Sequence, residues 1–320
     1  MLEAQHAALQ QGAEFHPEAY LRAERLRATQ NDAPKPSRAW VATMKVPFLD
    51  TSPMIGPASC TEQAFEEPLL RHCVLDPSTL VFEKRLGGGL DGFVWKVRFG
   101  NKGPFALKLF WDNPPESEHY YAAQRECHNA AIFQMMEASL AKATADSRSI
   151  QVHANPRTQD DAMDNLFAFC DDAQMPPDPK SPFITTIEPG SSNTTSITSM
   201  PRLRKCYGWL KLGGEVFDSL PRRLQAHPYT VSKITRSISS SEEYTVLIYE
   251  YVEEGENDPA VVEEVDRFFW LAGFSHTFSP AARNWKNGVL IDLSDMIEAR
   301  GYGWLKMLYG PWEASQILVE

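Results

Sequence analysis

A glycine-rich segment stands between two stretches of strand-like sequence in this chain of 320 residues. Residues 85–97 have the sequence RLGGGLDGFVWKV, in which four glycines fall within six consecutive positions. Glycine weakens regular structure, so such a cluster marks a tight turn or a place where the backbone comes close to another group. The flanking sequence therefore predicts a β-hairpin with the glycines at its turn.

The glycine spacing, Gly87-x-Gly89-x-x-Gly92-x-Val94, is typical of two kinds of nucleotide site. In a dinucleotide-binding fold such glycines lie between a strand and a helix, whereas in a protein kinase they lie between two strands and cover the phosphates of ATP. Two predicted strands flank them here, which favours the kinase-type loop, whose backbone N–H groups point at phosphate oxygens. Taken alone, the loop is also typical of a plain flexible turn.

A lysine inside the following apolar strand strengthens the kinase interpretation. Lys108 belongs to the predicted strand Phe105–Phe110, where a charge is costly unless it is paired. A helix predicted over 116–142, with Ser117 as its N-cap, carries Glu126. In a kinase the strand lysine holds the phosphates and a helix glutamate fixes that lysine. We therefore expect Lys108 to pair with Glu126 and to bind phosphate.

Further residues of the predicted nucleotide site come from three strands. The segment Tyr244–Val252 resembles the strand that leads into the hinge of a kinase, where the backbone around Glu250 and Val252 would meet an adenine. Val94 and Ala106 complete the set of residues assigned to the nucleotide.

A candidate metal site follows in the C-terminal part of the chain. Asp292, in the sequence LIDLS at 290–294, resembles the metal-binding aspartate of the D-F-G motif, with Leu293 and Ser294 in place of Phe and Gly. Asn284 lies one residue away from the position of the metal-binding asparagine. Asn284 and Asp292 are therefore predicted to hold Mg²⁺, although Asp292 could also be a turn or cap carboxylate after a strand.

The catalytic base of an active kinase is missing. The best match to the H-R-D motif is His276-Thr277-Phe278, in which a phenylalanine stands where the aspartate should be. Phenylalanine cannot accept a proton, and general-base catalysis contributes about 10²- to 10⁴-fold. Asp266 and Asp295 are possible substitutes. The chain also ends soon after Asp292, without an A-P-E segment, so efficient catalysis is not expected.

These patterns predict an α+β, kinase-like protein in three parts. Residues 1–78 are expected to form an extended or irregular leader, residues 79–256 an antiparallel-sheet N-lobe, and residues 257–320 a reduced helical C-lobe with an aromatic tail. The polar stretch 143–200 has the composition of a disordered insertion in the N-lobe. Strands are predicted at Leu80–Arg85, Val94–Phe99, Phe105–Phe110, Leu203–Leu212, Tyr244–Val252 and Val289–Leu293, a second helix at Pro259–Phe274, and a hairpin turn at Asn287-Gly288.

Bulk composition narrows the class of partner. The formal net charge of −11 argues against a protein whose main task is to grip nucleic-acid phosphates. The five cysteines are odd in number and form no C-x-x-C, which favours reduced thiols in the cytosol or nucleus. No apolar run is long enough to cross a bilayer, and no secretory signal is present. We expect protein partners, and neither nucleic acid nor membrane.

The chain resembles a family of kinase-like proteins of filamentous fungi that are described as Fta-type subunits of an inner-kinetochore complex. The resemblance covers about residues 80–300 without the insertion, and it is carried by Leu86–Val94, Phe105–Phe110, Glu126–His128, Asn284–Trp285 and Gly288–Ser294. It implies a pseudokinase fold, a location in the nucleus and a role in chromosome segregation, with other kinetochore subunits as partners.

Two functions follow from the sequence. The first is a pseudokinase module that binds protein partners, with ATP and Mg²⁺ as candidate ligands. In it the tail aromatics Trp304, Tyr309 and Trp312 would either form an interaction surface or complete the core. The second is a divergent phosphotransferase that uses ATP and an unusual base.

Overall fold

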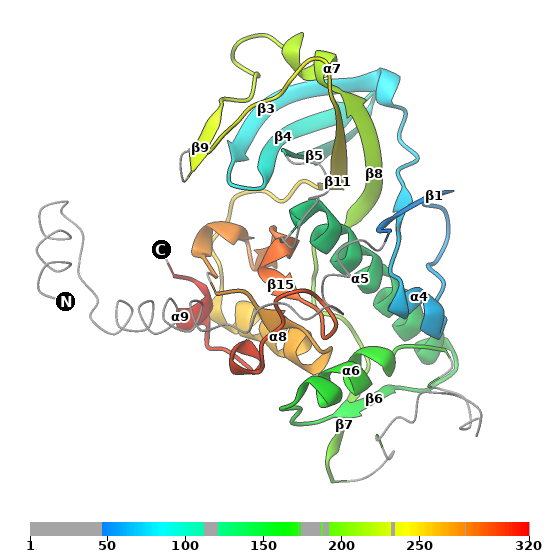
Figure 1. Ribbon diagram of the computed structural model, residues 1–320. Coiled ribbons are helices and arrows are strands. Elements are labelled where there is room, and N and C mark those ends of the chain that lie inside the picture. Colours follow the sequence, from blue (N-terminus) through cyan, green and yellow to red (C-terminus); the bar gives the residue numbers. More distant parts are fainter. Residues whose placement is uncertain are drawn as a thin grey trace, which may run out of the picture. The chain divides into compact units, whose positions relative to one another are not determined.

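The computed structural model describes residues 47–111, 121–171, 192–231, 234–278 and 280–319, together with residues 173 and 187. All described residues belong to one compact unit, within 40–320. Within them the fold is α+β, with a seven-stranded mixed sheet and six α-helices (Figure 1). The predicted N-cap Ser117 lies outside the described residues.

The sheet has an antiparallel part and a parallel edge. Its strand order is β3 (Leu80–Gly88), β4 (Gly92–Phe99), β5 (Lys102–Phe110), β11 (Glu243–Glu250), β8 (Cys206–Gly213), β2 (Leu70–His72) and β1 (Leu49–Pro53). The predicted meander of β3, β4 and β5 is confirmed, and these strands pair antiparallel with one another and onward to β11 and β8. The predicted antiparallel pairing holds for the sheet strands between 79 and 256. The sheet as a whole is mixed, because two strands of the predicted leader extend it: β2 joins β8 in parallel and β1 joins β2 in parallel.

The two faces of the sheet are buried in two separate cores. Side chains alternate between the faces of a strand, so Phe93 and Trp95 face one core while Val94 packs against the other. The same alternation in β5 separates Leu107 and Leu109 from Ala106 and Phe110. Lys108 therefore lies on the second face, and that face is covered by helix α5 (Ala122–Ala145) (Figure 1).

The part of the leader that the structure describes is neither irregular nor superficial. Besides β1 and β2 it contains helix α4 (Glu62–Glu66) and the 3-10 turn η1 (Pro77–Thr79). Phe65 and Leu70 are almost completely buried, at 1% and 0% exposure. The prediction fails here because β2 is short and finds its partner, β8, more than a hundred residues later, so no local pattern reveals it.

The prediction of a disordered insertion over 143–200 is wrong for a large part of that stretch. Strand β6 (Ile150–His153), helix α6 (Gln159–Phe167) and strand β7 (Thr194–Ile197) form there. Thr158 and Asp161 form a capping box at the start of α6. The amide of the fully buried Asn165 donates to the carbonyl of Leu271, so α6 is tied to the C-terminal end of the helix Pro259–Leu271. The remaining residues of the predicted insertion lie largely outside the described ranges.

The C-terminal part is built from short elements. They are helices α7 (Gly214–Asp218), α8 (Pro259–Leu271) and α9 (Ala314–Ile317), strand pairs β9–β10 (Tyr229–Val231, Ile234–Arg236), β12–β15 (Ser275–His276, Met296–Ile297) and β13–β14 (Trp285–Lys286, Val289–Leu290), and 3-10 turns η3 (Ala282–Asn284), η4 (Leu293–Asp295) and η5 (Lys306–Leu308). Asn287 and Gly288 have φ of 51° and 71°, which confirms the predicted hairpin turn.

The tail aromatics belong to the core rather than to an exposed surface. Trp304 is 4% exposed and Tyr309 is 8% exposed, and their rings contact each other. Trp312 is half-buried, and its backbone N–H donates to Asp266 at 2.7 Å. Of the two interpretations of the tail, completion of the core is confirmed. No helix in the described ranges has the length and apolar character needed to cross a membrane.

Candidate functional site

Lys108 lies at the centre of a buried charged cluster. Its side chain forms an ion pair with Glu126, and its Nζ lies 3.1 Å from Oδ1 of Asp292. Lys108 is 6% exposed and Glu126 is fully buried. The hydroxyl of Tyr249 donates to the second carboxylate oxygen, Oε2, of Glu126 at 2.9 Å. The structure thus brings the predicted pair together and adds two partners to it.

Strand register explains why these groups meet. Lys108 pairs across the sheet with Val94 on β4 and with Leu247 on β11, and laterally paired residues share one face. Ala106 pairs in the same way with Tyr249. Val94, Ala106, Lys108 and Tyr249 therefore all face α5, as the nucleotide assignment of the first three requires.

Helix α5 is held in register by polar contacts to the segment that follows Asp292. The guanidinium of Arg125 donates to the carbonyl of Ser294 at 3.1 Å and to that of Tyr302 at 2.8 Å. The amide of Asn129 donates to the carbonyls of Leu293 and Met296, each at 2.8 Å. These contacts flank Glu126 on the helix, so they fix its carboxylate opposite Lys108.

The charged groups in this cluster shift one another's pKa values. Burial lowers the pKa of Lys108, but Asp292, Glu126 and Asp91 outweigh burial and hold it above its usual range. Burial raises the pKa of Glu126 against the pull of Lys108. Burial would also raise the pKa of Asp292, but Lys108 and Ser294 hold it below its usual range. Lys108 therefore remains charged and Asp292 remains ionised.

The glycine loop is a closed hairpin whose turn is fastened to the next strand. The N–H of Gly89 donates to the carbonyl of Gly92 at 2.9 Å. Trp111 donates its indole N–H to the carbonyl of Gly89 at 2.9 Å and its backbone N–H to that of Asp91 at 3.1 Å. The sequence did not predict this role of Trp111, because the residue follows the predicted strand Phe105–Phe110 and no local pattern links it to the glycine turn.

The structure requires glycine to different degrees at the three glycine positions of the motif. A Cβ on Gly92 would lie 1.8 Å from the carbonyl oxygen of Leu109, so only glycine fits between β4 and β5 at this point. Gly87 has a φ of 151°, which disfavours other residues, whereas a Cβ on Gly89 would meet no atom within 4 Å. Gly89 is thus dispensable for packing, and its lack of a side chain is compatible with a ligand nearby.

The predicted hinge is partly occupied by protein groups. The backbone N–H of Glu250 donates to the carbonyl of Lys205 at 2.8 Å, and the carbonyl of Glu250 accepts from Nε of Arg204 at 3.1 Å. The side chain of Glu250 pairs with Arg202 at 2.6 Å. Of the two predicted hinge residues, only Val252 has no backbone hydrogen bond to another described residue, so its backbone is the one that could meet a base.

The predicted metal residues are neighbours but have different partners. The amide nitrogen of Asn284 donates to Oδ2 of Asp295 at 2.6 Å. Asp292 accepts from the hydroxyl of Ser294 at 2.7 Å, so it caps a turn and also contacts Lys108. Both interpretations of Asp292 are therefore compatible with the structure. Across the described ranges, His, Cys, Asp and Glu side chains form no group of three that could hold a metal ion.

The two candidate substitutes for the missing base have different environments. Asp266 is 2% exposed and accepts from the ring of His276 at 2.5 Å and from the backbone of Trp312. These structural contacts leave it no access to a substrate. Asp295 is half-buried, and the N–H of Thr277 donates to its carbonyl at 2.9 Å, which places Asp295 beside the loop that contains Phe278.

The environment of Asp295 also changes its acidity. Burial and the nearby charge of Asp292 raise the pKa of Asp295 to about 7, although the hydrogen bond from Asn284 acts in the opposite direction. A carboxyl group with a pKa near neutrality is suited to proton transfer.

Searches against protein-family models, curated proteins and solved structures found no match for this chain.

Proposed function

We propose that this chain is a kinase-like module that binds Mg-ATP between the glycine hairpin and Asp292 and acts mainly through protein partners. The observation that carries the proposal is the position of Lys108, which is bound by Glu126 from α5 and by Asp292 from the segment before η4. In protein kinases the strand lysine, the helix glutamate and the metal-binding aspartate must be in place together.

The residues around Lys108 fit a nucleotide in chemistry. Val94 and Ala106 supply apolar surface on the face of the sheet that carries Lys108, and Val252 supplies backbone groups for a base. Carboxylates outnumber the cation here even without Glu126, whose pKa is raised, because Asp292 and Asp91 both act on Lys108. A triphosphate alone would be repelled by this excess of negative charge, so we expect its binding to depend on a divalent cation.

The oxygens near η4 fit Mg²⁺. Asp292 and Asp295 offer carboxylate oxygens, and Asn284 retains its amide oxygen because its nitrogen is the atom that donates to Asp295. Oxygen ligands of this kind suit Mg²⁺, which neutralises phosphate charge when it is bound. These three residues would hold it together with the phosphates.

Efficient phosphoryl transfer is not part of the proposal. Phe278 stands at the position of the base, and Asp266 is engaged by His276 and Trp312. A module that binds nucleotide without transferring phosphate acts through the surfaces that it presents to other proteins. The resemblance to Fta-type subunits supports a place among kinetochore proteins in the nucleus.

One observation favours the alternative, a divergent phosphotransferase. Asp295 contacts Thr277, which belongs to the best match to the H-R-D motif, and Asn284. Its carboxylate would accept the proton of a substrate hydroxyl in place of the residue missing at position 278. The hydroxyl oxygen would then attack the terminal phosphorus of ATP, and ADP would leave.

Thermal unfolding with ATP tests the binding proposal. Mg-ATP at about 100 times its dissociation constant should add about 2.7 kcal/mol to the stability of the folded chain. We expect a clear rise in Tm with ATP and Mg²⁺, a much smaller rise with ATP alone, and no difference between the two in Asp292→Asn. The absence of a rise with Mg-ATP at any concentration would refute the proposal.

Transfer of labelled phosphate separates the two functions. The pseudokinase proposal expects no transfer above background with general protein substrates or water, in the parent or in Asp292→Ala. Transfer by the parent that disappears in both Asp292→Ala and Asp295→Asn would establish the alternative. Transfer that survives in Asp295→Asn would exclude that residue as the base.

A further inference from the structure

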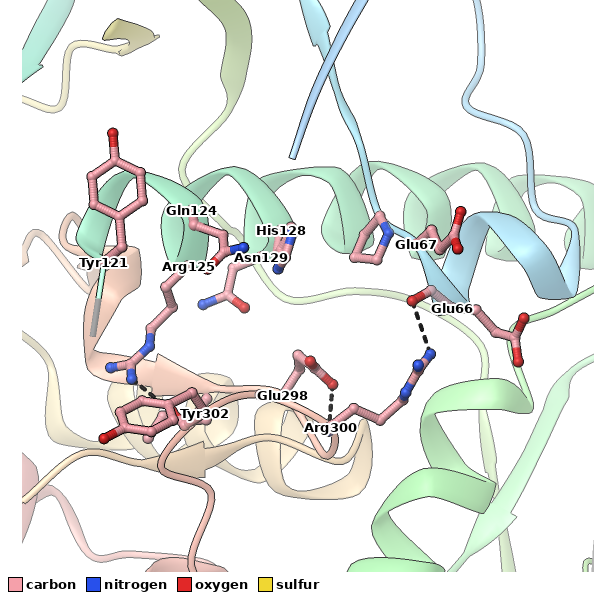
Figure 2. A pocket seen from close by; sticks show the side chains of 13 residues that line it. Glu66, Glu67, Tyr121, Gln124, Arg125, His128, Asn129, Glu298, Arg300 and Tyr302 are labelled. Atoms are coloured by element: carbon pink, nitrogen blue, oxygen red, sulfur yellow. Dashed lines mark hydrogen bonds between the residues drawn. The ribbon is translucent and has the colours of Figure 1, made fainter. Parts of the chain in front are cut away.

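Helix α5 borders two cavities, which lie on different faces of the helix. The smaller one has a volume of about 140 Å³. Figure 2 shows that its two arginines are engaged by its own walls, since Arg125 donates to the carbonyl of Tyr302 and Arg300 donates to that of Glu66. The residues of α5 that line the larger cavity are displaced from those of the smaller one by about half a turn around the helix axis. The larger cavity is therefore a separate space.

The larger cavity has a volume of about 880 Å³. This lies within the range of about 300–1,000 Å³ that is typical of ligand sites. Its walls are one stripe of α5, the loop 54–58, residues 73–75 and the segment 200–207. The guanidinium of Arg71 donates to three backbone carbonyls of the loop, at 3.1 to 3.3 Å. This wall is therefore held in place by the protein's own contacts.

Small and apolar side chains line a large part of the cavity. Ala130, Ala138 and Ala141 lie on one stripe of α5, and short side chains let another chain come close to the helix. The stripe extends over about 17 Å of the helix axis, which suits a peptide segment better than a compact small molecule. On the facing walls Val74 is 54% exposed and Ile55, within the loop, is 71% exposed. A bound segment would remove this apolar surface from water.

Three cationic side chains of the lining form no ion pair in the described ranges. Arg71 donates to neutral carbonyls, and so does Arg204, whose acceptors are the carbonyls of Glu250 and Ile291. Arg204 is only 8% exposed, so little water screens its charge. Lys205 is exposed, and its ammonium is free to meet a partner at the rim of the cavity.

The other charged groups of the lining do not cancel this positive charge. Arg202 and Glu250 pair with each other at 2.6 Å, which leaves Glu137 as the remaining carboxylate of the lining. Three cations thus stand against one carboxylate, in a chain whose formal net charge is −11. Nη2 of Arg204 makes no hydrogen bond within the described part of the chain. It retains accessible surface, because the enclosed polar atoms without a partner there belong to other residues. The lining therefore favours an anionic occupant.

From these observations we infer that the cavity is a docking site for an acidic peptide segment of another protein. Apolar side chains of the segment lie against the alanine stripe of α5, and its carboxylates lie beside Lys205 and Arg204. Complementary charge selects the sign of the partner. Single-stranded nucleic acid is disfavoured, because its bases need exposed aromatic faces for stacking and the net charge of the chain repels its phosphates. The inference goes beyond nucleotide binding and does not require it.

Fluorescence anisotropy with labelled dodecapeptides tests the inference on the full chain without nucleotide. The probe LLEELLEELLEE carries both the apolar and the acidic side chains. LLKKLLKKLLKK reverses its charge, and SSEESSEESSEE removes its apolar side chains. We expect the first peptide to bind about tenfold more tightly than either of the others. A dodecamer of thymidylate is the nucleic-acid probe and should bind more weakly than the first peptide.

Methyl NMR with labelled methionine locates the bound peptide. Met54 and Met200 line the cavity, whereas Met307 is 57% exposed and does not line it. The methyl signals of Met54 and Met200 should shift when LLEELLEELLEE is added, and that of Met307 should not.

Two variants with matched controls test the assigned contacts. Ala141→Trp places an indole in the cavity from an exposed position of α5 and should weaken binding about tenfold, since it takes the space of the leucines. Ala145→Trp makes the same change at an exposed position of α5 outside the lining and should bind as the parent does. Lys205→Glu should weaken binding about fivefold. Its control is Lys102→Glu, because Lys102 is exposed and lies outside the lining.

Three results would overturn the inference. The first is the absence of LLEELLEELLEE binding at about 1 mM, where specific recognition would be detectable. The second is equal binding of the lysine peptide, or tighter binding of the oligonucleotide, which would assign the cavity to nucleic acid. The third is binding that leaves Met54 and Met200 unshifted or that is unchanged in both Ala141→Trp and Lys205→Glu. If Ala141→Trp does not fold, the methionine shifts and Lys205→Glu decide the outcome.

Discussion

The ammonium nitrogen of Lys108 lies 3.1 Å from Oδ1 of Asp292, although 184 positions separate the two residues. The same nitrogen contacts Glu126, so one side chain joins the sheet, helix α5 and the segment before η4. A buried cation with two carboxylate partners couples the stability of these three segments.

Replacement of Lys108 by methionine should destabilise the fold strongly. Breaking a buried ion pair by removing one partner costs about 3–5 kcal/mol, because the other charge stays buried and unpaired. Urea unfolding of Lys108→Met and of the parent measures the loss. Lys142→Met is the matched control, since Lys142 pairs with Asp171 at the surface, and it should change little. Equal stability of the two variants would show that the buried cluster contributes nothing.

Two alanine substitutions in the glycine motif should differ sharply in effect. In Gly92→Ala the new Cβ would lie 1.8 Å from the carbonyl oxygen of Leu109, and the strands must separate. We expect a loss of about 2–3 kcal/mol in the free energy of unfolding. In Gly89→Ala the Cβ meets nothing within 4 Å, so chemical denaturation should give a value close to that of the parent. A comparable loss in both variants would contradict the packing argument.

Trp111→Phe should loosen the turn of the glycine hairpin without unfolding the sheet. The substitution removes the indole N–H that binds the carbonyl of Gly89 and keeps an aromatic ring against Phe93. Hydrogen exchange followed by mass spectrometry should become faster in 86–92. Trp209→Phe is the control, because that indole binds the carbonyl of Asp50 and its loss should affect 47–53 instead. Unchanged exchange in the hairpin would show that Trp111 does not restrain it.

Asp295→Asn should stabilise the protein in a pH-dependent way. The pKa of Asp295 is raised to about 7 in the folded chain from 3.8. Between these values the folded state binds more protons than the unfolded state, so the contribution of Asp295 to stability falls as pH rises. Asparagine does not titrate and still accepts the bond from Asn284. The advantage of the variant in urea should therefore be larger at about pH 8 than at about pH 4. An advantage that is constant with pH would argue against a raised pKa.

Local sequence patterns were sufficient to predict the glycine hairpin and the pairing of Lys108. The β3–β4–β5 meander rests on tight turns and two-residue alternation, both of which involve neighbours in sequence. The meeting of Lys108 with Glu126 followed from the cost of burying a lone charge. The alternation would also have placed Tyr249 on the face of Lys108, which is the signal by which its bond to Glu126 could have been found.

Other parts of the fold depend on distant partners that no local pattern specifies. Strand β2 is three residues long, and its pairing of His72 with Trp209 is set by the finished sheet. Helix α6 carries a capping box, which is a local helix signal. The polar composition around the helix nevertheless predicted disorder, and it gave no sign that Leu166 would be buried. Asp91 acts on Lys108 only because the hairpin folds over β5.

The four carbonyls that receive hydrogen bonds from Arg125 and Asn129 limit how this protein could be regulated. An outward movement of α5 would separate Glu126 from Lys108. It would also break the hydrogen bonds from Arg125 and Asn129 to all four carbonyls. Such a movement needs a compensating rearrangement of the whole 293–302 segment. Any regulatory signal that moves α5 therefore has to move residues 293–302 with it.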